Sequence, residues 1–257
     1  MNPVIESLLK HKSIRKFKDK PIEDEKLDLI IKAAQAAPNW CNGQHVTIIS
    51  IRDKETKERL AKWSLNQTFI NTCPIFLVFC ADFYRTQLAF EKNGRDVKPF
   101  VEQLDTVLIG AHDVGIAMEN AIVAAESMGL GTCCIGGIRQ ASLSFVKELN
   151  LPKYVFPVVG LCLGYPDDDP GIKPRLAKNA IYFEGKYDIT HLKEEIDKYD
   201  EVYKNYIKNR GSNAKDTNWS EKLSSYYLGE VKNGVGTYDQ DYELLKQQGI
   251  IEINKKK

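Results

Sequence analysis

The chain has 257 residues, of which 43% are hydrophobic, and its 36 Lys and Arg side chains nearly balance 35 Asp and Glu. This length supports one substantial core, or a core with an extension. A net charge of +1 gives no overall field for nucleic acid or an anionic membrane, so neither is an expected partner. The N-terminal stretch lacks the unbroken apolar region of a signal peptide, and we expect a cytoplasmic protein.

The first part of the chain alternates helical and strand patterns. Apolar residues at spacings of three and four predict a helix over residues 24–37. A β-branched run predicts a strand over 46–51, and Asp53 is placed to cap a helix that runs to Trp63. The continuous apolar run at 75–81 is typical of a strand covered on both faces.

Residues 101–130 give the strongest helical pattern in the chain. From Val114 onward this helix is apolar on most sides, which predicts a central position or a subunit interface. Gly129 is placed to end it. Beyond it we predict, in chain order, a short strand over 135–138, a helix over 142–149, a strand over 155–163 and a helix over 189–207.

The alternation of strands and helices indicates an α/β or α+β fold. Few clean strand–helix–strand units occur, and the strand order does not follow from the sequence. Residues 1–185 carry the alternation, whereas residues 186–257 are more polar and rich in Lys and Tyr. The motifs of nucleotide, zinc and serine hydrolysis are absent, so we expect no metal site.

The first motif that suggests chemistry is the run from His11 to Phe17. In an extended segment His11, Ser13 and Arg15 share one face. A hydroxyl flanked by a cation and a potential cation suits a phosphate monoester. Taken alone, however, the run is more often a solvated basic stretch.

The second motif runs from Ala37 to Gln44 and joins a predicted helix to a predicted strand. Pro38 ends the helix, and Asn, Gly and Gln then form a polar turn. Amides placed there are suited to a planar ligand with both donors and acceptors, such as the edge of a flavin ring. The alternative is an ordinary connecting loop.

Two further motifs are weak when each is taken alone. Gly136 and Gly137 let the backbone approach a ligand closely and offer N–H groups to an anion, although a tight turn needs the same residues. Lys173 and Arg175 flank Pro174, which fixes the local backbone, so the pair suits a phosphate clamp. Two basic residues in a loop are also common.

Taken together, in this order and spacing, the motifs resemble the nitroreductase family. The resemblance is to its NADPH-preferring branch, which contains oxygen-insensitive nitroreductases and FMN reductases. Further shared blocks are F-C-A-D-F at 79–83, A-A-E-S-M-G-L-G at 124–131, G-L-C-L-G-Y-P at 160–166 and R-G-S-N-A-K at 210–215. The resemblance covers nearly the whole chain.

The resemblance implies an α+β fold: an α-β-α sandwich with a mostly antiparallel sheet and a long central helix. It also implies an interlocked homodimer with FMN at the interface. Residues 1–185 would form the FMN-binding core. Residues 186–257 would be a C-terminal extension of the same domain, serving as dimer arm and nucleotide-binding loop.

The family's functional residues map onto this sequence as follows. The phosphate and ribityl chain of FMN would be held by His11, Lys12, Ser13 and Arg15, with Arg15 reaching the ring, and the phosphate clamp would be completed by Lys173 and Arg175. Asn39 would bind FMN, Gln67 would contact it from the partner subunit, and the ring edge would be lined by Cys134, Ile135, Gly136 and Gly137. NADPH would be recognised by Arg210 and Lys215. No side chain is expected to act as an obligatory acid.

Three positions depart from the family pattern. Asn39-Trp40-Cys41 stands where small hydroxyl residues are usual, so Trp40 is expected to affect the acceptor pocket. Cys134 stands where Tyr is frequent. Lys215 stands where Arg is frequent and lacks its bidentate fork.

The implied activity is a two-step exchange at one site. NAD(P)H reduces FMN, and an acceptor such as a nitroaromatic, quinone, azo dye or free flavin then takes the two electrons. One alternative is a flavin-binding redox sensor without turnover, which Cys41 near the flavin would suit. Another is a specialised flavin reductase or dehalogenase.

Overall fold

The structure, a computed structural model, describes residues 2–209, 214–230 and 240–251. By their contacts these residues form two compact units. The first unit runs to Asp168 and also contains residues 240–251, whereas the second begins at Asp169 and includes the described residues up to 230. The predicted division into an FMN-binding core (residues 1–185) and a C-terminal extension (residues 186–257) concerns function, and it stays a prediction.

A four-stranded sheet forms the centre of the first unit. Its strands are β1 (Val46–Ile51), β2 (Ile75–Asp82), β3 (Gly131–Ile135) and β4 (Val155–Gly164), in the spatial order β1-β2-β4-β3. Every neighbouring pair is antiparallel. The register places Leu77 opposite Leu161 and Cys133 opposite Cys162, and the pairing of β2 with β4 shifts between Phe79 and Cys80.

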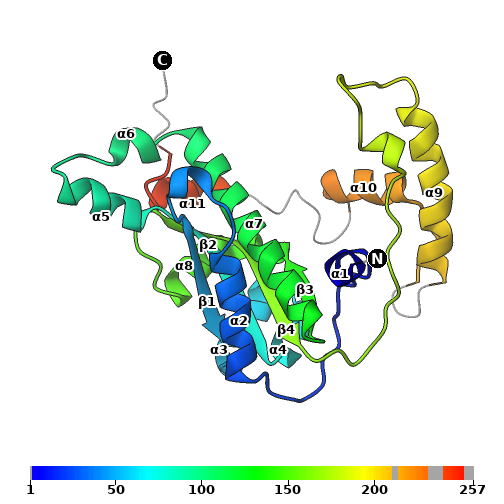
Figure 1. The fold of residues 1–257 in the computed structure, drawn as a ribbon, viewed down its shortest axis with the longest axis horizontal. Helices are drawn as coiled ribbons and strands as arrows, with labels where there is room; N and C mark the ends of the chain where they lie inside the picture. Colours follow the sequence, from blue (N-terminus) through cyan, green and yellow to red (C-terminus); the bar gives the residue numbers. More distant parts are fainter. Residues whose placement is uncertain (1, 210–213, 231–239, 252–257) are drawn as a thin grey trace. The chain divides into compact units, whose positions relative to one another are not determined.

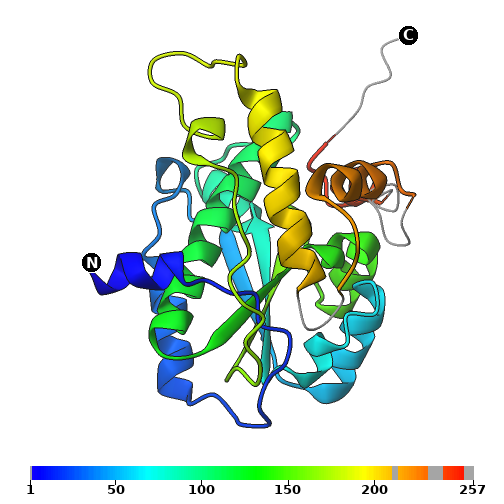
Figure 2. The ribbon, with the colours of Figure 1, turned by 90° about the vertical axis from the view of Figure 1, so that its right-hand side faces the viewer.

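Helices cover both faces of this sheet (Figures 1 and 2). Alternate residues of β2 enter two separate cores, because successive side chains of a strand point to opposite faces. Leu77 packs with α2 (Asp24–Gln35) and α7 (Leu104–Ser127). Phe76 packs with α3 (Lys54–Trp63), α4 (Phe69–Thr72) and α8 (Ser142–Glu148). The predicted α+β sandwich with an antiparallel sheet is confirmed.

Helix α7 confirms the long central helix but begins later than the pattern predicts. A separate short helix, α6 (Lys98–Val101), precedes it. Gln103 then has an extended backbone, and its side-chain amide donates to the Pro99 carbonyl oxygen, so the chain breaks before Leu104. By length and composition α7 is apolar enough to cross a membrane, yet it is packed against α2 and the sheet as a core helix.

The short strand predicted over 135–138 is wrong in its position. Strand β3 covers Gly131–Ile135, and a 3-10 helix over Gly136–Ala141 follows it. Pairing with β4 recruits Gly131 and Thr132, which carry no strand-like apolar pattern of their own. Gly136 and Gly137 therefore begin the 3-10 helix that follows the strand.

The remaining helices include α1 (Pro3–Leu9), α5 (Tyr84–Lys92) and α11 (Asp241–Gln247) in the first unit, and α9 (Leu192–Lys208) and α10 (Trp219–Tyr227) in the second. The predicted helix over 189–207 is confirmed as α9. Its tyrosines form a small core with α10, in which Tyr199 and Tyr203 are buried and Trp219 packs against them. Leu244 of α11 belongs to the first unit's core.

Candidate functional site

The N-terminal segment that follows α1 is held against strand β3. Ser13 forms a parallel bridge with Thr132, and the Ile14 N–H donates to the Thr132 carbonyl oxygen at 2.8 Å. Ile14 is buried against Gly131, where an added Cβ would lie 2.6 Å from Ile14 Cγ1. With Ile14 turned into the core, its neighbours Ser13 and Arg15 point the other way.

Glu126, at the end of α7, joins this segment to β3. Its Oε1 accepts from His11 Nδ1 and from Thr132 Oγ1, each at 2.8 Å. A carboxylate oxygen accepts from His11 when the imidazole carries a proton on Nδ1. Sequence reasoning did not select Glu126 as a site residue, although the shared block A-A-E-S-M-G-L-G contains it.

Within one chain, Arg15 lies beside Phe69 of α4, and Gln67 lies beside Gly137. The Arg15 guanidinium lies 6.0 Å from the centre of the Phe69 ring, at the start of α4. Gln67 precedes that helix, and its Nε2 would lie 3.2 Å from a Cβ on Gly137. Gln67 thus reaches the same place as the glycine pair without a partner subunit.

The end of β3 supplies a backbone edge beside these side chains. Ile135 is fully buried and Gly137 is buried, whereas Cys134 is exposed. Although Cys134 is exposed, protein atoms around its thiol exclude part of the water, and this desolvation, with the nearby Cys133, Glu119 and Glu126, raises the pKa of the thiol to about 11. The thiol is therefore protonated at neutral pH and is a poor nucleophile. At this edge, the groups suited to contact a ligand are therefore those of the backbone.

Two polar atoms near this edge lack a hydrogen-bond partner in the part of the chain that the structure describes. Gln67 Oε1 and Ser64 Oγ are buried and have no hydrogen-bond partner among the described residues. Buried acceptors are rarely left unpaired. A planar ring with N–H donors would satisfy Gln67 Oε1, and Gly137 leaves no side chain in its way.

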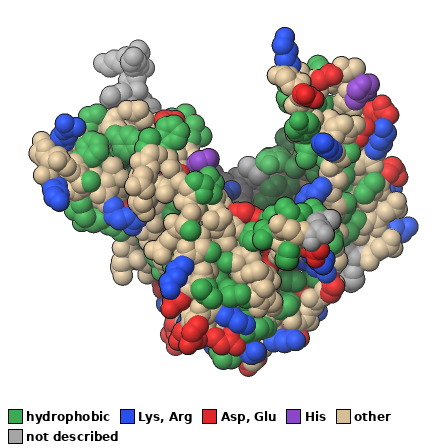
Figure 3. Space-filling view, in the orientation of Figure 1, with side chains coloured by type: hydrophobic (Ala, Val, Ile, Leu, Met, Phe, Trp, Pro, Cys, Tyr) green, Lys and Arg blue, Asp and Glu red, His purple; other side chains and the backbone are tan. Residues whose placement is uncertain are grey.

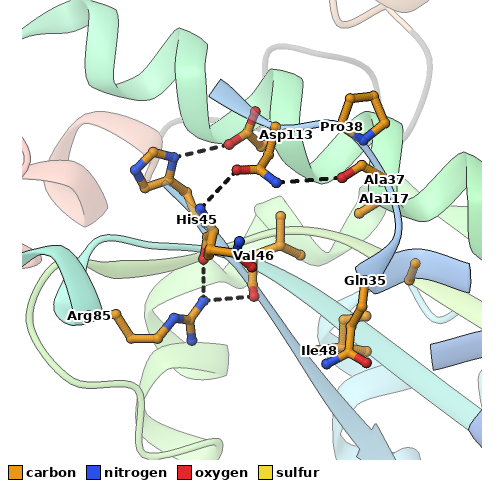
Figure 4. Close-up of a pocket in the computed structure, with 12 residues that line it drawn as sticks. Gln35, Ala37, Pro38, His45, Val46, Ile48, Arg85, Asp113 and Ala117 are labelled. Atoms are coloured by element: carbon orange, nitrogen blue, oxygen red, sulfur yellow. Dashed lines mark hydrogen bonds and ion pairs between the residues drawn. The ribbon is translucent and has the colours of Figure 1, made fainter. Parts of the chain in front are cut away.

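The loop from Asn39 to Gln44 lies elsewhere in the first unit. Asn39 Oδ1 accepts from the Gln44 N–H at 3.0 Å, and its Nδ2 donates to the Ala37 carbonyl oxygen at 3.5 Å. The loop borders a pocket of about 240 Å³ that Asp113 of α7 also lines (Figure 4). Along α7, Asp113 is roughly 20 Å of helix axis from Glu126. One chain therefore does not bring Asn39 to His11.

The predicted phosphate clamp belongs to the second unit. Lys173 and Arg175 are exposed, and Arg175 Nη1 donates to the Lys173 carbonyl oxygen at 3.0 Å. The Tyr199 hydroxyl of α9 donates to the Pro174 carbonyl oxygen at 2.8 Å, which fixes the loop. Lys215 is exposed. Arg210 lies outside the described residues.

The fold defines an α+β protein whose candidate site lies at the edge of its sheet. A model of the nitroreductase family matches residues 8–165, and a model of that family's C-terminal domain matches residues 173–252. The chain belongs to the nitroreductase family.

Relatives span nearly the whole chain. An FMN reductase [NAD(P)H] from Bacillus subtilis is 42% identical over 252 residues, 97% of this chain and 98% of the relative. An oxygen-insensitive NADPH nitroreductase from Salmonella typhimurium is 39% identical over 223 residues, 87% and 90% of the two chains.

Two solved structures share the fold. The structure of NfrA2 from B. megaterium has a TM-score of 0.91 at 42% identity and covers 98% of this chain and 99% of that chain. The NADPH:FMN oxidoreductase from Vibrio harveyi, complexed with NAD+, has a TM-score of 0.83 at 34% identity and covers 96% and 98%.

Proposed function

We propose that the protein is an FMN-dependent NAD(P)H oxidoreductase that passes two electrons to nitroaromatic, quinone, azo or flavin acceptors. The observation that carries the proposal is that Gln67 lies beside Gly137 at the end of β3, and Arg15 beside Phe69 of the adjoining α4, within one chain. Relatives named FMN reductase and NADPH nitroreductase support it. FMN, when bound, takes a hydride from NAD(P)H and passes the electrons on.

The residues at the edge of β3 fit a flavin. Gln67 Oε1 is a buried acceptor that a ring N–H would satisfy, and the backbone of Gly136 and Gly137 can lie close to the ring. Arg15 supplies a permanent positive charge, which favours the site when negative charge develops on the ring. His11, Lys12 and Ser13 would bind the ribityl chain and phosphate, and Cys134 and Ile135 would border the ring through their backbone.

We further propose a homodimer that completes the site. Asn39 is distant from His11 in one chain, and Asn39 of the partner subunit would reach the flavin instead. Apolar surface supports such an association: Val4, Ile5, Leu8 and Leu9 of α1 are exposed, and they belong to a hydrophobic patch that is visible over α1 in Figure 3. Exposed apolar surface of this kind commonly marks a protein interface.

The second unit would supply the charges for phosphate recognition. Lys173 and Arg175 would complete the clamp on the FMN phosphate, and Arg210 and Lys215 would bind NADPH. Residues 1–185 would then be the FMN-binding core and residues 186–257 its dimer arm and nucleotide-binding loop. Buried free cysteines such as Cys73 and Cys162 suit a reducing compartment, so we place the protein in the cytoplasm.

Flavin titration of the apoprotein tests the proposed site. Wild type should bind FMN more tightly than riboflavin, because the phosphate adds charge-assisted hydrogen bonds. Arg15→Ala should weaken FMN binding by about tenfold or more, since one charged contact is lost. Quenching of flavin fluorescence gives both dissociation constants.

The control for this titration is Arg59→Ala, which removes an exposed arginine that pairs with Glu148 at 2.6 Å. It should leave flavin binding unchanged. Equal affinities of the Arg15 and Arg59 variants for FMN would contradict the proposed site.

A further inference from the structure

The loop that carries Asn39 has a strained backbone. Cys41, Asn42 and Gln44 have φ values of 49°, 55° and 58°, in the left-handed region. Residues with side chains pay an energetic penalty there, and such conformations persist only where the surroundings enforce them. The contacts that hold this loop are therefore of interest for function.

One buried carboxylate holds the start and the end of the loop. The Asp113 side chain is 0% exposed. Its Oδ1 accepts from the Trp40 backbone N–H at 2.9 Å, and its Oδ2 accepts from His45 Nδ1 at 3.0 Å. Figure 4 shows His45 and Asp113 pointing toward each other beside the pocket. The exposed His112 ring also reaches Oδ1, at 3.3 Å.

The His45 ring in turn is held by packing. It is 4% exposed and lies 4.8 Å from the Phe83 ring, centre to centre. On its other side it lies against Gly43, where an added Cβ would be 1.9 Å from His45 Cε1. Gly43 has an ordinary negative φ, so the position requires glycine for space. The position of the His45 ring therefore depends on the conformation of the loop at Gly43.

We propose that Asp113 is a positioning residue for the oxidoreductase reaction. Through Trp40 and His45 it fixes the Asn39–Gln44 loop in the shape that presents Asn39 to the flavin and Trp40 to the electron acceptor. This inference rests on the proposed function of Asn39. In this role Asp113 acts through its two hydrogen bonds and not through its charge. A neutral residue that keeps both hydrogen bonds should therefore preserve the function.

Amide hydrogen exchange and flavin titration test the inference on the full-length protein. Asp113→Ala removes a charged hydrogen bond, so it should speed hydrogen exchange of the Trp40 amide and weaken FMN binding by about tenfold. At saturating FMN, the KM for a quinone acceptor should rise by a similar factor. The value of kcat at saturating FMN and quinone should change by less than about twofold.

Asp113→Asn should restore most of these values. Its oxygen can accept from the Trp40 N–H, and its Nδ2 can donate to His45 when the imidazole proton moves to Nε2. Gly43→Ala breaks the same arrangement from the loop side, so it should reproduce Asp113→Ala without touching the carboxylate. This second variant keeps the test valid if Asp113→Ala folds poorly.

Thr106→Ala is the matched control. Thr106 is also fully buried on α7, and its hydroxyl donates to the Phe100 carbonyl oxygen at 2.7 Å. It should lower stability while leaving the FMN Kd and the quinone KM unchanged. If Asp113→Ala and Gly43→Ala bind FMN as tightly as Thr106→Ala does, the positioning role is refuted. If wild type itself binds no FMN, the proposed function fails instead.

Discussion

At the scale of single residues, the candidate site depends on side chains that join distant parts of the chain. Glu126 binds His11, which is 115 positions away in the sequence. Asp113 binds the Trp40 amide across 73 positions. Sequence motifs pointed to the residues that we propose for flavin binding, whereas these two carboxylates lie within a helical pattern that is typical of a core helix. Only the fold reveals what they contact.

Gly131→Ala tests how closely the N-terminal segment must approach β3. The new Cβ would lie 2.6 Å from Ile14 Cγ1, and Ile14 is too buried to move freely. We expect a loss of about 1–3 kcal/mol in the free energy of unfolding, together with weaker FMN binding. Urea denaturation and flavin titration measure the two effects.

The exposed Ser127 provides the comparison for that experiment, because it lies near the same end of α7. Ser127→Ala should change the free energy of unfolding by less than about 0.5 kcal/mol. Gly131→Ala behaving like Ser127→Ala would mean that the segment is not held as closely as the structure shows.

At the scale of elements, apolar patterns predicted the longer helices α2, α3, α7 and α9 and the strands β1, β2 and β4. The β-branched run at 46–51 and the unbroken apolar run at 75–81 correspond to β1 and β2. The sequence failed where pairing or a local contact decides the boundary. Gly131 becomes part of β3 through its partner Gly164, and the chain breaks at Gln103 inside an apolar pattern.

The end of β4 and the start of α2 are joined by a pH-dependent contact. The Tyr165 hydroxyl donates to Glu23 Oε2 at 2.6 Å, and this bond, with the nearby Lys26 and Lys20, lowers the pKa of Glu23 to about 2. The resulting stabilisation is complete above the ordinary carboxyl pKa of about 4.3 and disappears as pH falls toward 2.

Tyr165→Phe should therefore move the pKa of Glu23 up toward its ordinary range, which carbon NMR of the carboxyl group measures. The variant should be less stable than wild type at neutral pH, and the difference should vanish near pH 2. Tyr182→Phe removes a hydroxyl from an exposed tyrosine and should leave Glu23 unchanged. An unaltered titration of Glu23 in Tyr165→Phe would show that the bond is absent in solution.

At the scale of the whole molecule, α7 organises the first unit. It packs against α2 and the sheet, and two of its carboxylates, Glu126 and Asp113, hold the segments around His11 and Asn39. Those segments lie roughly 20 Å apart along the helix. A single flavin could therefore contact both segments only if two chains contribute to its site. The sequence resemblance implied such a homodimer, and the separation of the two segments supports it as a proposal.

The most direct test of the oxidoreductase assignment is the visible spectrum of the purified protein without oxygen, before and after NADPH is added. We expect a yellow protein whose flavin absorption bleaches on addition of NADPH, more slowly with NADH, and returns when a nitroaromatic or quinone acceptor follows. A colourless protein that takes up no added FMN, or a bound flavin that neither nucleotide reduces, would contradict the account.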